Sequence, residues 1–347
     1  MNITFKPGIG EVRNLLDSLY MLYNNNYKKN IESFNIKPDK AVEEALKYLS
    51  ERVSFNLKHQ ELFFKEDIFV APSLISSEAL EKCKTAEDFI NALKNLDEEE
   101  VRYRVLKDLK HDKDIKEEEL KIILQDERKT IDFIRNLQMP SSIKWEVFEF
   151  FQEVKASIGE LIEFLEKYYP LCMGILEENK ASIQEFDNYL INGIENDGEA
   201  FIKKITRELI DFDGVDEIFA ASAFFNSHSL IFDGRGSKLY LFVGTTFEQA
   251  AKELFGEEQV EINLNILKNL SDKTRFQILM LIKDKEMYGQ ELADKVGITM
   301  ATVSYHMSYL LLSNIVLIDK IGHKGYYKLN KDTLRKNIDF LKGIFEL

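Results

Sequence analysis

The side chains best suited to chemistry lie near the C-terminus, in the stretch TVSYHMSYLLLSN at residues 302–314. Its first half carries hydroxyl, imidazole and phenol groups, and its second half is almost wholly apolar. On a helix, Val303, Met307 and Leu310 would share one face, and Tyr305 would lie nearly opposite. DNA-reading helices present their N-terminal residues to base edges while the protein holds the other end. The stretch therefore favours hydrogen bonding in a groove rather than bond-making chemistry.

A second group of polar residues follows this stretch. Lys320, Lys324 and Lys328 are spaced four apart around the sequence GHKG at residues 322–325, which has the length of a hairpin tip. Lysines at such a tip can contact phosphate oxygens, and hydroxyl and apolar groups on the helix can contact bases. The predicted DNA-contacting residues are Arg275, Met300, Thr302, Ser304, Tyr305, His306, Ser308, Lys320, His323, Lys324 and Lys328.

Catalytic and metal-binding patterns are weak elsewhere. The two cysteines, Cys83 and Cys172, are far apart and have no metal or redox spacing, so we expect unreactive thiols in a reducing cytoplasm. His306 and His323 could be metal ligands, but a phosphate neighbour and a solvent-exposed wing tip are simpler interpretations. The sequence has no HExxH, GxSxG or P-loop. We therefore expect no enzyme activity, no metal and no cofactor.

Two other kinds of motif are interpreted structurally. The acidic runs at residues 97–100 and 117–119 are typical of solvated helix ends. The glycine pairs at residues 8–10 and 234–236 lack the strand, helix and third glycine of a phosphate loop, so we interpret both as turns.

Charge is divided unequally along the chain. The net charge is −14, yet residues 262–347 hold 13 lysines and arginines against 9 acidic residues, whereas residues 1–261 hold 33 against 51. This asymmetry indicates two different roles, with a DNA-binding role assigned to the last quarter. No apolar run approaches the length of a membrane helix and no signal peptide is apparent, so we expect a cytoplasmic protein with no membrane contact.

The elements that position these residues can be placed by periodicity. Residues 11–211 have apolar side chains mostly at helical spacing, as in 12–23 and 147–165. Residues 3–5 could form a short strand. Residues 217–244 have short aromatic and β-branched runs separated by turn residues, which predicts a small antiparallel β-meander. A helix at 246–255 and a hinge at 256–258 would follow. The predicted fold is mainly α (α+β), with a large helical sensor domain at 1–258 and a second domain at 262–347.

The second domain has a boundary signal at each expected element. Ser271 can cap a helix that continues to Lys283, and a second helix at 288–296 would end at Gly297, where a positive φ is needed. Thr299 can then cap the helix that carries Tyr305. Two strands around residues 322–325 would form a wing, and an amphipathic helix at 333–345 would form a dimer surface with the helix at 262–270. This arrangement is a winged helix-turn-helix.

The segment resembles the ArsR-type bacterial transcriptional regulators over about 70 residues. The matching residues are Leu270, Ser271, Asp272, Thr274, Arg275, Ile278 and Leu279; Glu291, Leu292, Ala293, Val296, Gly297, Ile298 and Thr299; Thr302, Val303, Ser304, His306, Met307 and Leu310; and Gly325, Tyr327 and Leu329. The resemblance implies a homodimer that places two such helices in successive major grooves of a pseudo-palindromic operator, usually as a repressor released by an effector.

The departures from the family pattern restrict the effector. Tyr305 and Ser308 stand where the family often has Arg, His or Lys, so phosphate or guanine contact from this helix should be weaker. The family's cysteine pair is replaced by EMYGQEL, and its last-helix Asp and His ligands are reduced to Asp332 and Asp339. We therefore expect a non-metal signal, a small molecule or a protein, acting on residues 1–258. The alternative is that the winged helix docks or dimerises proteins and is attached to an N-terminal enzyme or ligand-binding domain.

Overall fold

The structure is a computed structural model that describes residues 1–25, 27, 31, 36–66, 68–109, 117–137, 139–210, 212–255, 259–321 and 324–347. Residues 1–255 are mainly helical, as predicted. Their helices are α1 (Pro7–Asn24), α3 (Lys40–Ser50), α4 (Gln60–Phe64), the 3₁₀ helix η1 (Ala71–Ser73), α5 (Ser77–Lys82), α6 (Ala86–Leu93), α7 (Glu98–Leu109), α8 (Glu117–Leu124), α9 (Glu127–Asn136), α10 (Ser141–Gln152), α11 (Val154–Glu178), α12 (Lys180–Asp197), α13 (Glu199–Ile205) and α14 (Phe247–Phe255). No helix among the described residues is long and apolar enough to cross a membrane.

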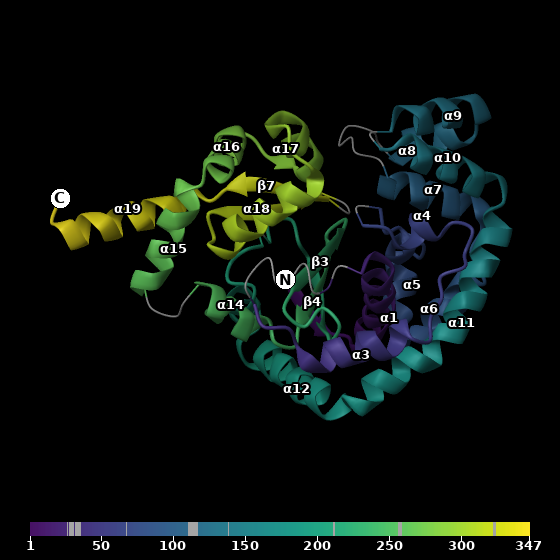
Figure 1. Cartoon of the computed structure of the whole chain (residues 1–347), viewed down its shortest axis with the longest axis horizontal. Helices are drawn as coiled ribbons and strands as arrows, with labels where there is room; N and C mark the ends of the chain where they lie inside the picture. Colours follow the sequence, from purple (N-terminus) through teal and green to yellow (C-terminus); the bar gives the residue numbers. More distant parts are fainter. Residues whose placement is uncertain are drawn as a thin grey trace.

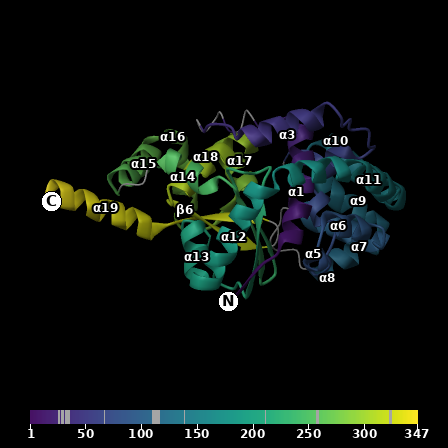
Figure 2. The same cartoon turned by 90° about the horizontal axis from the view of Figure 1, so that it is seen from below.

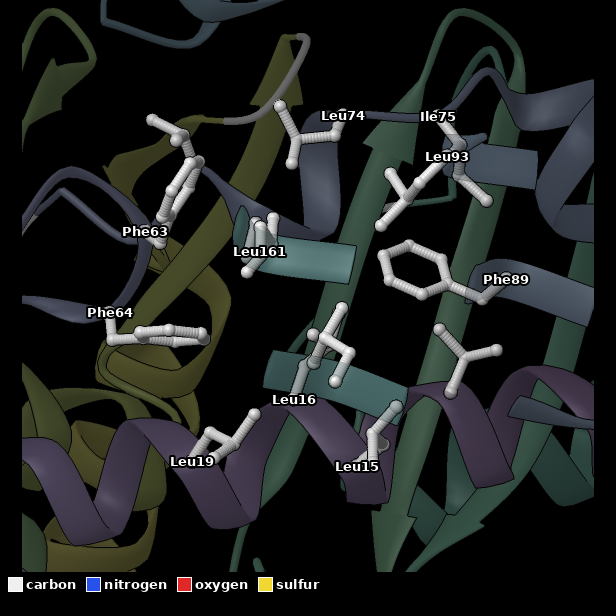
Figure 3. Packing of buried hydrophobic residues seen from close by; sticks show 14 of the residues in the cluster. Leu15, Leu16, Leu19, Phe63, Phe64, Leu74, Ile75, Phe89, Leu93 and Leu161 are labelled. Atoms are coloured by element: carbon white, nitrogen blue, oxygen red, sulfur yellow. The ribbon is translucent and has the colours of Figure 1, made fainter. Parts of the chain in front are cut away.

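The largest core forms around α1, because this helix buries apolar residues over most of its surface. Leu15, Leu16 and Leu19 are fully buried and point toward Phe64 of α4 and Leu161 of α11 (Figure 3). In Figure 1 the helices α4 to α11 curve around one side of the molecule, and α11 and α12 follow the outer edge. The acidic run at 97–100 begins α7, where the Asp97 carboxylate accepts from the backbone N–H groups of Glu99 and Glu100, as expected of a helix end.

The sheet of this region is mixed, so the predicted antiparallel meander at 217–244 is wrong. Its strands are β1 (Asn2–Phe5), β2 (Glu217–Ala223), β3 (Leu230–Arg235) and β4 (Lys238–Gly244), in the order β1-β2-β4-β3. β2 is parallel to both β1 and β4, and only β3 and β4 form the predicted hairpin. Residues 218–223 and 239–244 are all buried, which is typical of parallel strands covered on both faces.

The interpretation of residues 8–10 as a turn is also wrong, because they form the first turn of α1. A Cβ at Gly8 would lie 2.2 Å from the carbonyl oxygen of Cys83, and one at Gly10 would lie 3.1 Å from Ala221 Cβ. These glycines let α1 approach the neighbouring backbone and strand β2 closely. The other pair behaves as predicted, since Gly236 turns the β3–β4 hairpin with a φ of 65°.

The C-terminal domain has the predicted winged helix-turn-helix. Its elements are α15 (Gln259–Ser271), α16 (Lys273–Ile282), β5 (Met287–Tyr288), α17 (Gly289–Val296), α18 (Met300–Leu312), β6 (Val316–Ile321), β7 (Lys324–Leu329) and α19 (Lys331–Phe345). Gly297 ends α17 with a φ of 76°, as predicted. The cap of α16 is Asp272 rather than Ser271, whose hydroxyl donates back to the Lys268 carbonyl at the end of α15. β5, which pairs with β7, was not predicted. The proposed hinge at 256–258 lies outside the described residues.

The C-terminal domain contacts the rest of the chain through α18 and the wing. Ile318 N of β6 donates to the Leu209 carbonyl at 3.2 Å, and Ile318 forms a parallel bridge with Ile210. Leu312, at the end of α18, packs against the apolar cluster that contains Leu241 and Phe247. α19 projects from the opposite side and ends at the C-terminus (Figures 1 and 2).

Candidate nucleic-acid interface

Helix α18 has the buried face and the exposed face that its sequence predicts. The Thr299 hydroxyl accepts from Thr302 N at 3.2 Å and so caps the helix. Val303, Met307 and Leu310 are at most 1% exposed. They pack in the core of the C-terminal domain with residues of α16 and α17. Apolar packing of this buried face therefore determines the orientation of the helix on the domain.

The exposed face of α18 carries Ser304 and Tyr305. Tyr305 is 37% exposed, and its ring lies edge-on to the rings of His306 and Tyr309 at centroid distances of 5.3 and 5.2 Å. Ser308 lies one turn after Ser304 and donates its hydroxyl hydrogen to the Ser304 carbonyl at 2.8 Å. Its oxygen can still accept a hydrogen bond. This face offers an oriented phenol and hydroxyl groups, which suits contact with base edges.

Arg275, a predicted phosphate contact, is turned toward its own domain. Its side chain is 11% exposed, its Nε donates to the Asn269 carbonyl at 3.3 Å, and its guanidinium lies 5.1 Å from the centre of the Tyr309 ring. Asp272 Oδ2 lies 3.7 Å from it. Arg275 thus supports the Tyr309 ring, which in turn supports Tyr305, and a direct phosphate contact would need a change of its side-chain conformation.

His306 also faces inward, toward α16. Its side chain is 13% exposed, and Nδ1 lies 3.8 Å from Asp272 Oδ1, too far for a hydrogen bond. Burial lowers the pKa of His306, and the charge of Arg275 lowers it further, against the opposing attraction of Asp272. Partial burial raises the pKa of Asp272. Backbone hydrogen bonds and the charges of Arg275 and His306 together outweigh burial, so the net effect is a lowered pKa. The imidazole is therefore neutral at pH 7 and adds no charge to the interface.

Met300 and Thr302 lie at the start of α18 and are half-buried. The Met300 side chain covers the start of α17, because a Cβ added at Gly289 would lie 2.4 Å from Met300 Cε. The Thr302 hydroxyl shares a 2.8 Å hydrogen bond with the Thr299 hydroxyl. Met300 thus links the two helices of the motif, and Thr302 belongs to the helix cap.

The predicted wing is present as the β6–β7 hairpin, in which Ile321 pairs with Lys324. Lys328 is half-buried on β7, opposite Leu317. Lys320 and Lys324 belong to the two strands, but their side chains lie outside the described residues, as does His323 altogether. The structure thus places Ser304 and Tyr305 on the exposed face of α18 and turns Arg275 and His306 inward. Ser308, also predicted to contact DNA, is half-buried and lies beside Phe247 and Ala250 of α14, so its side chain faces the N-terminal region instead.

Two supporting residues were absent from the predicted site. Asp272 accepts from Arg275 N at 2.9 Å and lies beside both Arg275 and His306. Tyr309 contacts Tyr305 and Arg275, and burial and the contact with Tyr305 raise its pKa to about 12. Asp272 could have been found from its preference for helix N-caps, and Tyr309 from its spacing of four after Tyr305.

The cysteines lie away from this interface. Cys83 and Cys172 are free and buried, and burial raises their thiol pKa values to about 11 and about 12. Among the residues that the structure describes, no three His, Cys, Asp or Glu side chains gather as a metal site would require.

Known proteins resemble the chain over its C-terminal quarter. The family model described as bacterial regulatory protein, arsR family, matches residues 272–316. The HTH-type transcriptional regulator KmtR of Mycobacterium tuberculosis is 31% identical over 23% of this chain, which spans 62% of the length of KmtR. The transcriptional repressor SdpR of Bacillus subtilis is 30% identical over 22% of this chain and 86% of its own.

Two further matches cover the same region. An arsenical resistance operon repressor of Staphylococcus xylosus is 34% identical over 22% of this chain and 76% of its own. Among solved structures, NolR from Sinorhizobium fredii is 29% identical over 25% of this chain and 87% of its own, with a TM-score of 0.22.

Proposed function

The chain belongs to the arsR family of bacterial regulatory proteins through its C-terminal domain, and we propose that it is a homodimeric, cytoplasmic repressor whose residues 1–255 sense a non-metal signal. DNA-binding regulation follows from the family. Repression is proposed because relatives such as SdpR are repressors. The observation that carries the proposal is the geometry of α18. The Thr299 cap and the buried Met307 hold the helix in place, and Tyr305 is exposed on its other face.

The proposed dimer surface is the exposed apolar face of α15 and α19. Leu264 is 58% exposed on α15, and Ile338 and Ile344 are 51% and 52% exposed on α19. Between the helices, Asn337 Nδ2 donates to Asn263 Oδ1 at 2.7 Å, and both residues are buried. This buried pair fixes the two helices against each other, so that they offer one preformed apolar surface to a second copy.

Charge supports the proposed division of roles. The acidic residues 1–261 repel DNA, and the basic excess lies in residues 262–347. DNA binding should therefore fall steeply as salt rises, since phosphate contacts release counterions. In a dimer, two copies of α18 would read half-sites about 10 base pairs apart or a multiple of this.

The test is fluorescence anisotropy of the full chain on DNA from its own upstream region, at several salt concentrations. We expect saturable, salt-dependent binding that Tyr305→Ala weakens, with unchanged circular dichroism. Lys324→Ala should reduce the salt slope by about two units, one for each protomer of the proposed dimer. Gln249→Ala, on the exposed side of α14, is the matched control.

The alternative predicts a different result in the same assay. If the C-terminal domain docks proteins, and residues 1–255 are an enzyme or ligand-binding domain, neither variant changes DNA affinity. Tight binding that does not respond to salt would also contradict the proposed electrostatics.

A further inference from the structure

A cavity of about 230 Å³ lies where α18 meets the N-terminal region. One wall consists of Leu230 and Phe232 of β3 with Phe247 and Ala250 of α14. The facing wall includes Ser308, Leu311 and Leu312 of α18 and Ile318 of the wing. The cavity therefore belongs partly to the helix that carries Tyr305 and partly to the proposed sensory region.

The lining is mostly apolar, and its one imidazole, that of His228, is hydrogen-bonded at both nitrogens. His228 Nε2 donates to the Lys37 carbonyl at 2.8 Å, and Nδ1 lies 2.9 and 2.8 Å from the hydroxyls of Ser227 and Thr246. Both ring nitrogens of His228 are therefore occupied by partners within the protein. Among the described residues, His228 is the one titratable side chain of the lining. An ion would lose its hydration against walls whose described residues are apolar apart from His228 and two serines, so the lining favours uncharged molecules.

Ser308 offers a polar group of the lining on α18 itself. The Ser308 hydroxyl donates its hydrogen to the Ser304 carbonyl at 2.8 Å, and its oxygen retains acceptor capacity. Ser304 belongs to the exposed face of α18. A ligand that donates a hydrogen bond to Ser308 would thus act one helical turn from the DNA-facing residues.

Size limits the ligand further. An apolar protein cavity of about 150 Å³ accommodates benzene, so about 230 Å³ accommodates on the order of ten non-hydrogen atoms. Burying most of such a ligand between apolar walls is the usual basis of small-molecule binding.

The surrounding backbone indicates how occupancy would reach the DNA-binding face. Leu209 lines the cavity, and its carbonyl accepts from Ile318 N of the wing at 3.2 Å. The two residues before it, Arg207 and Glu208, have φ values of 53° and 56°. Consecutive non-glycine residues in the left-handed region are strained, and such strain clusters at ligand-binding and switch segments.

We propose that this cavity binds a small, uncharged, largely apolar molecule with one hydrogen-bond donor, and that its occupancy changes the affinity of α18 for DNA. The regulatory part rests on the proposed function, because it assumes that α18 binds DNA. The binding part does not, since it depends only on the volume and chemistry of the lining. The two parts are tested separately.

The binding test uses ¹⁹F NMR of the full chain with two probes that each have ten non-hydrogen atoms. 5-Fluoroindole is neutral and carries one N–H donor, whereas 3-fluorobenzoate is an anion. We expect saturable shifts or broadening of 5-fluoroindole and none of 3-fluorobenzoate. Ala250→Leu, which fills the cavity from α14, should weaken 5-fluoroindole binding at least tenfold. Gln249→Leu, which adds an apolar side chain on the exposed side of the same helix, should leave it unchanged.

Two outcomes would overturn the ligand assignment. One is absence of saturable 5-fluoroindole binding, and the other is binding that Ala250→Leu leaves intact. If Ala250→Leu does not fold, Ala251→Val is the milder filling variant, since Ala251 lines the same cavity and is 2% exposed. It should weaken binding by a smaller factor.

The regulatory test measures DNA affinity of the full chain with and without saturating 5-fluoroindole. We expect a change of between about fivefold and 150-fold, and by linkage the DNA should change the affinity for 5-fluoroindole by the same factor. Unchanged DNA affinity with bound 5-fluoroindole would overturn the regulatory part alone. DNA binding without any 5-fluoroindole binding would overturn this inference and leave the proposed function standing. 5-Fluoroindole binding without DNA binding would overturn the proposed function.

Discussion

Two residues of α18, two positions apart, should give opposite phenotypes when truncated to alanine. Met307 is 1% exposed in the core of the C-terminal domain, whereas Tyr305 is 37% exposed. Truncating a buried methionine usually costs about 2–5 kcal/mol, because apolar contacts are lost and a cavity remains. Tyr305→Ala loses two edge-on ring contacts, with His306 and Tyr309, worth about 1–3 kcal/mol together, and a side-chain hydrogen bond with Tyr309, but it leaves no buried cavity.

For DNA affinity, in contrast, Tyr305→Ala should have the larger effect of the two substitutions. A side chain at a base edge contributes about 1–3 kcal/mol, and a dimer loses two of them, so Tyr305→Ala should weaken binding about 30-fold or more. Met307→Ala should bind DNA nearly as the unmodified chain does, at a temperature where it remains folded. Urea unfolding followed by circular dichroism measures the first effect, and fluorescence anisotropy measures the second. If Tyr305→Ala destabilises the domain as much as Met307→Ala, or leaves DNA affinity unchanged, the assignment of inner and outer faces is wrong.

Three further results are expected. Gly297→Ala should destabilise the C-terminal domain by about 1–2 kcal/mol, because Gly297 has a φ of 76°. Gly174→Ala in α11 should stabilise the chain by about 1 kcal/mol, because an added Cβ there meets nothing within 4 Å. Urea unfolding measures both changes. Cys83 and Cys172 should resist 5,5′-dithiobis(2-nitrobenzoate) at pH 8 until urea is added, since burial raises their pKa values to about 11 and about 12. The pKa of His306 is lower in the folded chain than in the unfolded chain, so the unfolded chain binds the proton first as the pH falls. The free energy of unfolding should therefore decrease as the pH drops below about 6.5. His306→Gln should reduce this decrease, measured as urea midpoints between about pH 7.5 and 5.5.

The helix-turn-helix could be predicted because each of its signals is local. The spacing of Val303, Met307 and Leu310 defines the buried face, while Gly297 supplies the positive φ and Thr299 the cap. None of these features depends on a distant part of the chain. The sequence of this segment alone is therefore sufficient to predict the helix-turn-helix.

The sheet could not be predicted in the same way, because its pairing is non-local. Residues 2–5 lie beside residues 217–220, more than 200 positions away, in a parallel register that no turn specifies. The aromatic and β-branched runs at 217–244 indicated strands but not their order. The continuous burial of β2 and β4, without alternation, was the available signal for a central, parallel position.

The inward turn of Arg275 and His306 shows a different limit. Both Ser271 and Asp272 are good helix caps, and the sequence alone does not choose between them. Because Asp272 caps α16, its carboxylate lies beside Arg275 and His306 and favours their inward conformations. The position of the cap, one residue later than predicted, thus places a carboxylate beside Arg275 and His306.

The two ends of α18 give the helix two different sets of contacts. Its N-terminal half is held by the domain core and presents Ser304 and Tyr305 outward, while Leu311 and Leu312 line a cavity shared with β3 and α14. A helix is stiff along its axis, so a change at the cavity that shifts its C-terminal end must also move Tyr305, two turns away. The same apolar contacts that cover Leu312 thereby connect the acidic N-terminal region to the face of α18 that is proposed to bind DNA.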